Sequence, residues 1–294
     1  MLKTNIATFY FLKAGLQTTI QDSGRFGYQS HGVPVSGVMD KQSAALANRL
    51  VANLPDAPVL EITLLGPSIR IEGDCQIAIT GANLSPKINN QAIPNYQTIN
   101  VKTGDILSFG AIRSGCRAYL AIGGNWLVPK WLGSYSALPF NGKKATPHSY
   151  IQKGSQLRVE TKPPITPKKI IEKEQPKIFN PLKVQVLPGP EFELFSVYDI
   201  GYFFSKHYRI TSDSNRMGYR LDTKIIDFKP PLKTISSGIV PGTIQITNAG
   251  QAVILMTDAQ TVGGYPRIAV VLSDDMDKLA QLKPGDGVGF ELVY

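Results

Sequence analysis

The sequence predicts a mainly β protein that consists of two related, closed or nearly closed β-barrels with a few peripheral helices. Its 294 residues are enough for two cores, and glycine (27) and proline (21) separate short apolar runs. Several blocks of sequence also recur in the same order in both halves, which is typical of a duplicated unit. The alternative, one large sandwich, needs a structureless loop of roughly 20 residues inside a compact domain, which is uncommon.

Six short runs have the length and the apolar or alternating pattern of strands. They are residues 77–80, 98–101, 118–122, 182–187, 244–247 and 252–256. Helices are few, and the best of them begins at Asp40, whose carboxylate suits an N-cap, and ends at Asn53. A second helix is expected from Ser273 to Pro284, and a third after Pro190.

The clearest repeat pairs residues 22–29 (Asp-Ser-Gly-Arg-Phe-Gly-Tyr-Gln) with 213–220 (Asp-Ser-Asn-Arg-Met-Gly-Tyr-Arg), which agree at five of eight positions. Three further pairs follow in the same order along the chain: 67–71 with 242–246, 80–83 with 257–260, and 102–109 with 283–290. The last pair shares Lys-x-Gly-Asp, which favours a tight turn into a closing strand. Because the matches are collinear, we interpret the halves as two related barrels.

The formal net charge of +9 is spread unevenly along the chain. Residues 162–183 hold six lysines against two glutamates, together with five of the 21 prolines. Such a composition stiffens a segment and keeps it solvated. We therefore interpret residues 162–182 as a basic linker between a first barrel domain, 1–161, and a second, 183–294. A nucleic-acid-binding strand is the alternative interpretation of this segment.

The sequence lacks the patterns that identify several classes of protein. There is no signal-peptide pattern and no apolar run near the roughly 18 residues of a membrane span, so we expect a cytoplasmic protein with neither membrane nor nucleic acid as a partner. Phosphate-loop, dinucleotide and Gly-x-Ser-x-Gly patterns are absent. The three histidines lack metal-ligand spacing, so we expect no metal. Cys75 and Cys116 lie in or beside apolar runs and are predicted to be buried thiols.

The densest group of polar residues follows the apolar run 253–256. It offers a carboxylate, an amide, a hydroxyl, two glycines and a phenol, in the residues Asp258, Gln260, Thr261, Gly263, Gly264 and Tyr265. Glycines let the backbone approach a ligand and present N–H groups to a developing oxyanion. The alternative is that the same residues make an ordinary turn and bond their own backbone.

The repeated Arg-x-x-Tyr motif suggests a second group of candidates. Arginine presents a planar fork suited to a carboxylate or phosphate, and a nearby phenol can donate a hydrogen bond. For the first copy, Arg25 and Tyr28, we favour a role in bracing a loop, and for the second, Arg216 and Tyr219, a contact with ligand. Asp40 is explained by helix capping.

Seven blocks of the sequence resemble the allophanate hydrolase subunit 2 family, which is also called the biotin-dependent carboxyltransferase family. The blocks are residues 15–28, 32–40, 46–51, 60–67, 215–221, 240–245 and 260–268. The resemblance covers nearly the whole chain, and it implies two cyclophilin-like β-barrel domains. This agrees with the duplication inferred above.

The resemblance implies the C subunit of an ATP-dependent 5-oxoprolinase, which opens 5-oxo-L-proline to L-glutamate. Its partners would be the B subunit, which is similar to allophanate hydrolase subunit 1, and the A subunit. ATP would act at the level of the complex, and the isolated chain would be inactive. One alternative is biotin-dependent carboxyl transfer to urea or a similar amide; the chain has no Met-Lys-Met attachment site, so the biotin carrier would be another protein. A second alternative is a non-catalytic regulator that binds a kinase-inhibitor-like partner.

The resemblance also implies roles for residues that match its motifs. Arg216 would hold a substrate carboxylate or the transferring phosphoryl group, the amides of Gly263 and Gly264 would polarise the amide oxygen, and Asp258 would orient or deprotonate. The implied catalytic residues are Asp258, Arg216 and Tyr219, and the implied substrate-binding residues are Gln245, Gln260, Thr261, Gly263, Gly264 and Tyr265.

Overall fold

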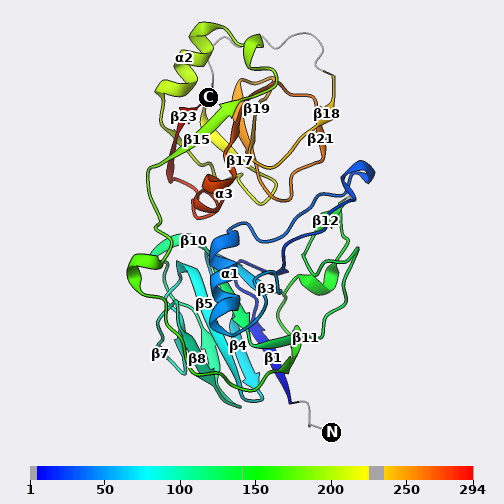
Figure 1. Cartoon of the computed structure of the whole chain (residues 1–294), viewed down its shortest axis with the longest axis vertical. Coiled ribbons are helices and arrows are strands. Elements are labelled where there is room, and N and C mark those ends of the chain that lie inside the picture. The colour runs from blue at the N-terminus through cyan, green and yellow to red at the C-terminus, as the bar shows by residue number, and fades with distance from the viewer. Residues whose placement is uncertain (1–4, 141, 225–234, 294) are drawn as a thin grey trace. The chain divides into compact units, whose positions relative to one another are not determined.

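The computed structural model describes residues 5–140, 142–224 and 235–293. The chain divides into two compact units (Figure 1). Unit 1 comprises Met1–Arg25 and Ser36–Lys177, and unit 2 comprises Phe26–Val35 and Ile178–Tyr294. The mainly β architecture is confirmed, and the assignment of residues 26–35 to unit 2 is a feature that the sequence did not predict. No helix in the described ranges is long and apolar enough to cross a membrane.

Unit 1 is built from a seven-stranded sheet of order β11-β14-β1-β4-β9-β6-β7 and a five-stranded sheet of order β2-β3-β10-β5-β8. The strands of the first sheet are β1 (Ile6–Lys13), β4 (Ser68–Glu72), β6 (Lys87–Ile88), β7 (Gln91–Ala92), β9 (Ile106–Ser108), β11 (Gly124–Trp126) and β14 (Gln156–Thr161). Those of the second are β2 (Gln17–Gln21), β3 (Val59–Thr63), β5 (Cys75–Asn83), β8 (Thr98–Val101) and β10 (Ser114–Ile122). A small hairpin of β12 (Pro139–Phe140) and β13 (Lys143–Lys144) lies outside both sheets.

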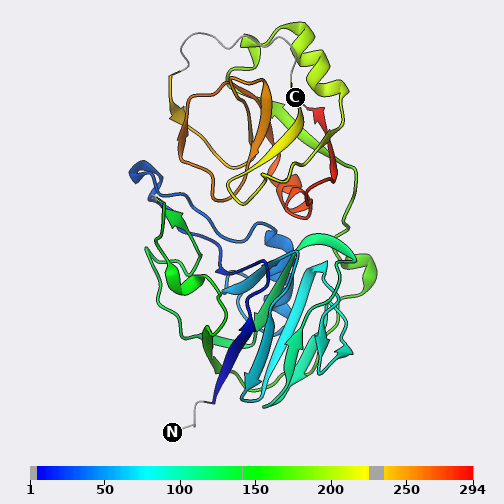
Figure 2. The ribbon, with the colours of Figure 1, turned by 180° about the vertical axis from the view of Figure 1, so that it is seen from behind.

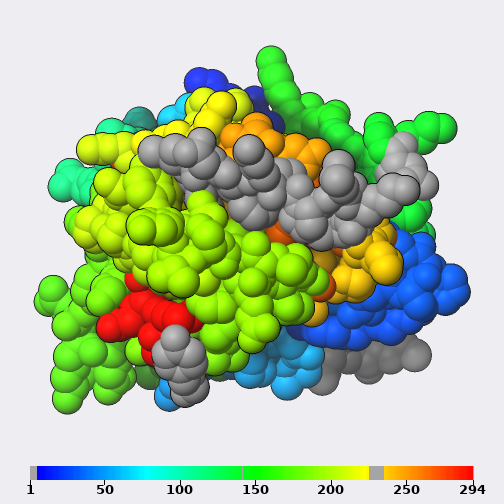
Figure 3. Space-filling model, turned by 90° about the horizontal axis from the view of Figure 1, so that it is seen from above, coloured from blue at the N-terminus to red at the C-terminus, as the bar shows by residue number. Residues whose placement is uncertain are grey.

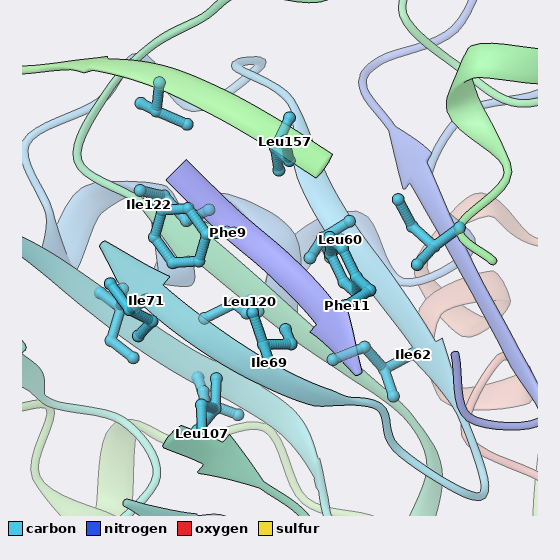
Figure 4. Close-up of a cluster of buried hydrophobic side chains, with 14 of the residues drawn as sticks. Phe9, Phe11, Leu60, Ile62, Ile69, Ile71, Leu107, Leu120, Ile122 and Leu157 are labelled. Carbon is cyan, nitrogen blue, oxygen red and sulfur yellow. The ribbon is translucent and has the colours of Figure 1, made fainter. Parts of the chain in front are cut away.

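The core of unit 1 lies between these two sheets. Alternate residues of β1 and β4, including Phe9, Phe11 and Ile69, are at most 1% exposed. They pack with side chains of β3 and β10, such as Leu60 and Leu120 (Figure 4). Burying a large apolar side chain contributes about 1.5–3 kcal/mol, so this cluster is the main source of stability in the unit.

Helix α1 (Lys41–Leu50) covers the other face of the five-stranded sheet through Ala44, Ala47 and Leu50, which are buried. Asp40 caps it, as predicted, because its Oδ1 accepts the backbone N–H of Ser43 at 2.8 Å. The helix ends three residues before the predicted end at Asn53.

Unit 2 is one seven-stranded sheet of order β16-β23-β15-β22-β19-β20-β17 that curves into a barrel (Figures 1 and 2). Its strands are β15 (Leu182–Pro188), β16 (Tyr208–Arg209), β17 (Gly218–Lys224), β19 (Thr243–Ile246), β20 (Gln251–Leu255), β22 (Arg267–Val271) and β23 (Gly287–Leu292). The two edge strands meet through an antiparallel bridge between Ile210 and Leu221. This bridge closes the barrel of unit 2, as the sequence predicted for the second half. Strands β18 (Ser237–Gly238) and β21 (Val262–Gly263) form a separate two-stranded antiparallel sheet.

Two helices belong to unit 2 in the predicted regions. Helix α2 (Val197–Ser205) follows Pro190 and begins with a capping box in which Ser196 and Asp199 bond each other's backbone. Its Phe203 stacks on Phe290 of β23 with ring centroids 4.8 Å apart, which fixes the helix on the barrel. The yellow-green segment that includes α2 is seen at the surface in Figure 3. Helix α3 (Ser273–Leu279) lies within the predicted range. Short 3-10 turns occur at Gln29–His31, Pro147–Ser149, Glu172–Glu174 and Phe192–Leu194.

The repeated Lys-x-Gly-Asp block forms the same turn in both units. The backbone N–H of Lys102 bonds Asp105 Oδ2 at 2.8 Å, and that of Lys283 bonds Asp286 Oδ2 at 3.1 Å. Gly104 and Gly285 both have a positive φ, at +96° and +89°. The strand orders of the two units differ, however, so the duplication is visible in local turns more than in sheet topology.

Part of the predicted linker lies against unit 1. The backbone N–H of Ile165 bonds Gln76 Oε1 at 2.9 Å, that of Lys168 bonds Thr98 Oγ1 at 3.0 Å, and Ile170 is 9% exposed. The segment therefore contributes a packed edge to unit 1. The domain limits at 161 and 183 stay a prediction.

Candidate functional site

A pocket of about 190 Å³ opens in unit 2 among β17, β19, β20 and the segment after β20. Lining residues include Asp213, Asn215, Met217, Gly218, Arg220, Gln245, Gln260 and Tyr265. Three of the predicted substrate-binding residues are thus brought together. The pocket also takes in Asp213, Asn215 and Arg220, which were not predicted as site residues, although all three belong to the repeated block 213–220.

Strand pairing sets which side chains face the pocket. Gly218 lies opposite Leu255, and Gln245 lies opposite Val253, so β17, β20 and β19 are adjacent here. Successive residues of a strand point to opposite faces. Gly218 and Arg220 therefore line the pocket, whereas Tyr219 between them is 2% exposed and points to the core.

The amide of Gln245 is held in a narrow space at the pocket wall. Gln245 is 2% exposed, and its Nε2 donates a long hydrogen bond to the carbonyl oxygen of Tyr265 at 3.4 Å. A Cβ on Gly263 would lie 2.8 Å from that Nε2 and 3.0 Å from Ile239 Cδ1. A side chain at position 263 would therefore push the Gln245 amide away from its place at the wall.

Arg216 and Asp258 form a buried ion pair rather than an open contact surface. Arg216 Nε and Nη2 donate to Asp258 Oδ2 and Oδ1 at 2.8 and 2.9 Å, and both side chains are 4% exposed. Nη2 also donates to Thr257 Oγ1 at 3.2 Å, and the backbone N–H of Asp258 bonds the carbonyl of Arg216 at 3.0 Å. The pair ties the segment before β17 to the segment after β20. Both segments contribute to the pocket wall.

Tyr219 lies apart from the other candidates. Its hydroxyl donates to the carbonyl oxygen of Leu282 at 3.2 Å inside the barrel. Thr261 and Gly264 are half-buried, and the carbonyl of Thr261 accepts the backbone N–H of Ile239 at 3.0 Å. The geometry therefore groups Gln245, Gln260 and Tyr265 at one pocket.

The pair of Glu191 and Arg267 was not predicted from the sequence. Arg267 Nε donates to Glu191 Oε2 at 2.6 Å, Nη2 donates to Oε1, and Nη1 donates to the carbonyl of Gly238 at 3.0 Å. The hydrogen bond from Arg267 lowers the pKa of the Glu191 carboxyl. The same bond raises the pKa of Arg267. Because Gly238 pairs with Val262 where β18 and β21 run antiparallel, this ion pair braces the strand that carries Gly263.

The first copy of the repeated block braces a loop, as predicted. Arg25 is 1% exposed, donates to the carbonyl of Ser136 and lies 5.1 Å from the ring centroid of Trp131. Asp22 accepts hydrogen bonds from Ser134 Oγ at 2.6 Å and from Ser136 Oγ. Both residues are therefore engaged with segment 131–136.

The two cysteines are free thiols. Cys116 is buried, whereas Cys75 is half-buried, so the predicted burial holds fully for one of them. Burial nonetheless raises the pKa of the Cys75 thiol to about 12, and Asp74 adds to the shift. A thiol with that pKa is a poor nucleophile near neutral pH.

Comparison with known proteins places the chain in a family of carboxyltransferase domains. The model of the carboxyltransferase domain, subdomain A and B, matches residues 31–292. The chain is 34% identical to the C subunit of 5-oxoprolinase from Escherichia coli (strain K12) over 282 residues, which are 95% of this chain and 89% of that protein. It is 36% identical to urea amidolyase of Saccharomyces cerevisiae over 301 residues, which cover 94% of this chain but 16% of that protein.

Solved structures agree with these relatives. The structure of the K. lactis urea amidolyase matches with a TM-score of 0.88 and 32% identity, over 98% of this chain and 19% of that one. Another solved structure, 28% identical with a TM-score of 0.85, is matched over 55% of its length. The chain thus spans about half or less of these two solved chains.

Proposed function

This chain belongs to the carboxyltransferase domain family (subdomain A and B), and on that premise we propose that it is the C subunit of an ATP-dependent 5-oxoprolinase. The proposed complex opens 5-oxo-L-proline to L-glutamate. Its other members are the B subunit, similar to allophanate hydrolase subunit 1, and the A subunit.

This proposal rests on the similarity to the E. coli C subunit, because the alignment covers most of both proteins. The alignment takes in 95% of this chain and 89% of that protein, so nearly all of the relative is matched. The urea amidolyase alignment is slightly more identical, but it takes in 16% of a much longer protein. A relative that is matched over nearly its whole length supports this proposal more directly than one that is matched over 16% of its length.

In the proposed reaction, ATP transfers its γ-phosphoryl group to the lactam oxygen and leaves as ADP. Water adds to the activated carbon, the ring C–N bond breaks to release the amine, and hydrolysis of the acyl phosphate frees phosphate and L-glutamate. The transferring group and the lactam oxygen carry the developing charge, which hydrogen-bond donors stabilise. The protein therefore has to supply positioned donors beside the lactam.

The pocket of unit 2 has groups suited to a small cyclic amide. The side-chain amides of Gln245 and Gln260 can both donate and accept, which matches the C=O and N–H of a lactam. The Tyr265 hydroxyl adds a donor. We assign Arg216 and Asp258 a positioning role, because their buried pairing holds the two segments that form the wall. The backbone amides of Gly263 and Gly264 stay candidates for polarising the lactam oxygen.

The test is reconstitution with the A and B subunits from the same genome. We expect ATP-dependent release of glutamate from 5-oxo-L-proline by the complex, and none without ATP or from this chain alone. Gln260→Ala, at an exposed pocket position, should raise the KM for 5-oxo-L-proline while the complex stays assembled. An assembled complex that releases no glutamate contradicts the proposal.

A second candidate is carboxyl transfer from biotin to urea or a similar amide, which the 36% identity to urea amidolyase favours. The two reactions are separated by their requirements. Carboxyl transfer needs a biotinylated carrier and is stopped by avidin, whereas the proposed lactam opening proceeds without biotin. Avidin-sensitive carboxylation of urea by the reconstituted proteins would establish this alternative.

A further inference from the structure

The two copies of the repeated Asp-Ser-x-Arg block each line a pocket within their own unit. In unit 2 the block supplies Asp213 and Asn215 to the pocket described above. In unit 1 the aligned Asp22 and Gly24 line a pocket of about 370 Å³. The aligned positions thus stand at a pocket wall in both units. The larger volume falls within the roughly 300–1,000 Å³ typical of small-molecule sites.

The walls of the unit 1 pocket are fixed by buried hydrogen bonds. Asp22 is 7% exposed and accepts from Ser134 Oγ at 2.6 Å and from the backbone N–H of Tyr135 at 2.8 Å. Asn53, 8% exposed, uses Oδ1 to accept the backbone N–H of Gly124 at 3.1 Å. These side chains are held in place before any ligand binds, which lowers the entropic cost of binding.

Two cations line this pocket and are exposed at its surface, Lys130 and Lys162. Lys162 Nζ donates to Asn53 Oδ1 and to the carbonyl of Ala52, both at 3.3 Å. Because an ammonium has three donors, Lys162 can bind a ligand and keep both contacts. Lys130 Nζ lies 4.8 Å from the ring centroid of Tyr135, which also lines the pocket.

Two acidic residues, Asp22 and Asp56, also line the pocket. The Asp22 carboxylate is engaged in the buried hydrogen bonds above, and Asp56 is solvent-exposed like the two lysines, so water and salt screen its charge and theirs alike. We propose that unit 1 carries a second small-molecule site, which binds an organic anion by its carboxylate or phosphate group through Lys130 and Lys162. This site does not rest on the proposed function.

The experiment is calorimetric titration of the full chain, at low salt, with four probes that separate the two sources of the anionic group. Inorganic phosphate and ADP supply phosphate, and 5-oxo-L-proline and L-glutamate supply a carboxylate. The variants are Lys130→Met and Lys162→Met, which keep the aliphatic stem. The matched control is Lys153→Met, an exposed lysine that does not line this pocket.

We expect saturable binding of at least one probe, weakened about tenfold or more by either pocket variant and unchanged by the control, because a charge-assisted hydrogen bond contributes that much. Binding of the phosphate probes alone would identify a phosphate ligand, and binding of the carboxylate probes alone a carboxylate ligand. Either result supports the site where the pocket variants weaken the binding. Circular dichroism checks that the variants are folded. No binding of any probe, or binding that both pocket variants leave intact, overturns the proposal.

Discussion

Arg216 and Asp258 meet through two parallel hydrogen bonds of 2.8 and 2.9 Å, although they lie 42 positions apart in the sequence. The pair joins the segment before β17 to the segment after β20, and both segments line the pocket of unit 2. Because both side chains are 4% exposed, each charge relies on the other to offset its loss of hydration. The site is therefore coupled to the stability of its barrel.

The first prediction follows from that burial. Asp258→Asn keeps the shape of the side chain but removes its charge, and should lower the free energy of unfolding by about 3 kcal/mol or more, since it leaves a buried guanidinium without its paired carboxylate. The matched control is Glu291→Gln in the exposed pair with Lys183, where the exposed fractions are 48% and 62%. This control should cost less than about 1 kcal/mol. Chemical denaturation measures both, and equal losses would contradict the buried-pair interpretation.

The sequence could identify Arg216 and Asp258 separately but not their pairing. Which residues meet across β17 and β20 depends on the register of the sheet, and register is set by packing over the whole barrel. The Lys102–Asp105 and Lys283–Asp286 turns were predictable because their hydrogen bonds are local. Local chemistry of that kind can be inferred from sequence, whereas a partner distant in the chain cannot.

The second prediction concerns the close packing of Gly263 on Gln245. Gly263→Ala would place a Cβ 2.8 Å from Gln245 Nε2, so the amide has to move from its position at the pocket wall. We expect a raised KM for 5-oxo-L-proline in the reconstituted complex with little change in kcat. Gly238→Ala, in the strand β18 that pairs with β21, meets nothing within 4 Å and is the control. A KM that changes equally in both variants would show that the pairing of β18 with β21, and not the Gln245 amide, is responsible.

The third prediction is a loss of stability in acid that depends on Glu191. The hydrogen bond from Arg267 lowers the pKa of the Glu191 carboxyl in the folded chain. This contribution to the free energy of unfolding is therefore present above the unfolded pKa, and it is lost as pH falls through the lower folded value. Glu191→Gln should be less stable near neutral pH and should lose less of its remaining stability on acidification from about pH 6 to about pH 3.

Urea denaturation across that pH range measures how the free energy of unfolding changes with pH in the wild type and in Glu191→Gln. Glu193→Gln, at an exposed carboxylate in the 3-10 turn that directly follows Glu191, should follow the wild-type curve. If Glu191→Gln also follows the wild-type curve, the ion pair with Arg267 does not contribute to acid stability.

The fourth prediction separates a structural from a catalytic role for Tyr219. Its hydroxyl donates to the carbonyl of Leu282 at 3.2 Å, and its side chain is 2% exposed on the core side of β17. The sequence favoured ligand contact because a phenol near the Arg216 guanidinium can donate a hydrogen bond to the same ligand. On a strand, however, alternation turns it away from the face that Gly218 presents. Tyr219→Phe should therefore cost about 1 kcal/mol of stability and leave kcat and KM unchanged.

Tyr265→Phe is the matched variant, because that hydroxyl belongs to a 43% exposed side chain that lines the pocket. It should raise KM and leave the free energy of unfolding unchanged within about 0.5 kcal/mol. The two variants remove the same atom from the same residue type, so opposite effects on stability and KM place one hydroxyl in the core and the other at the ligand. A fall in kcat for Tyr219→Phe without a loss of stability would instead establish the catalytic role that the family resemblance implies.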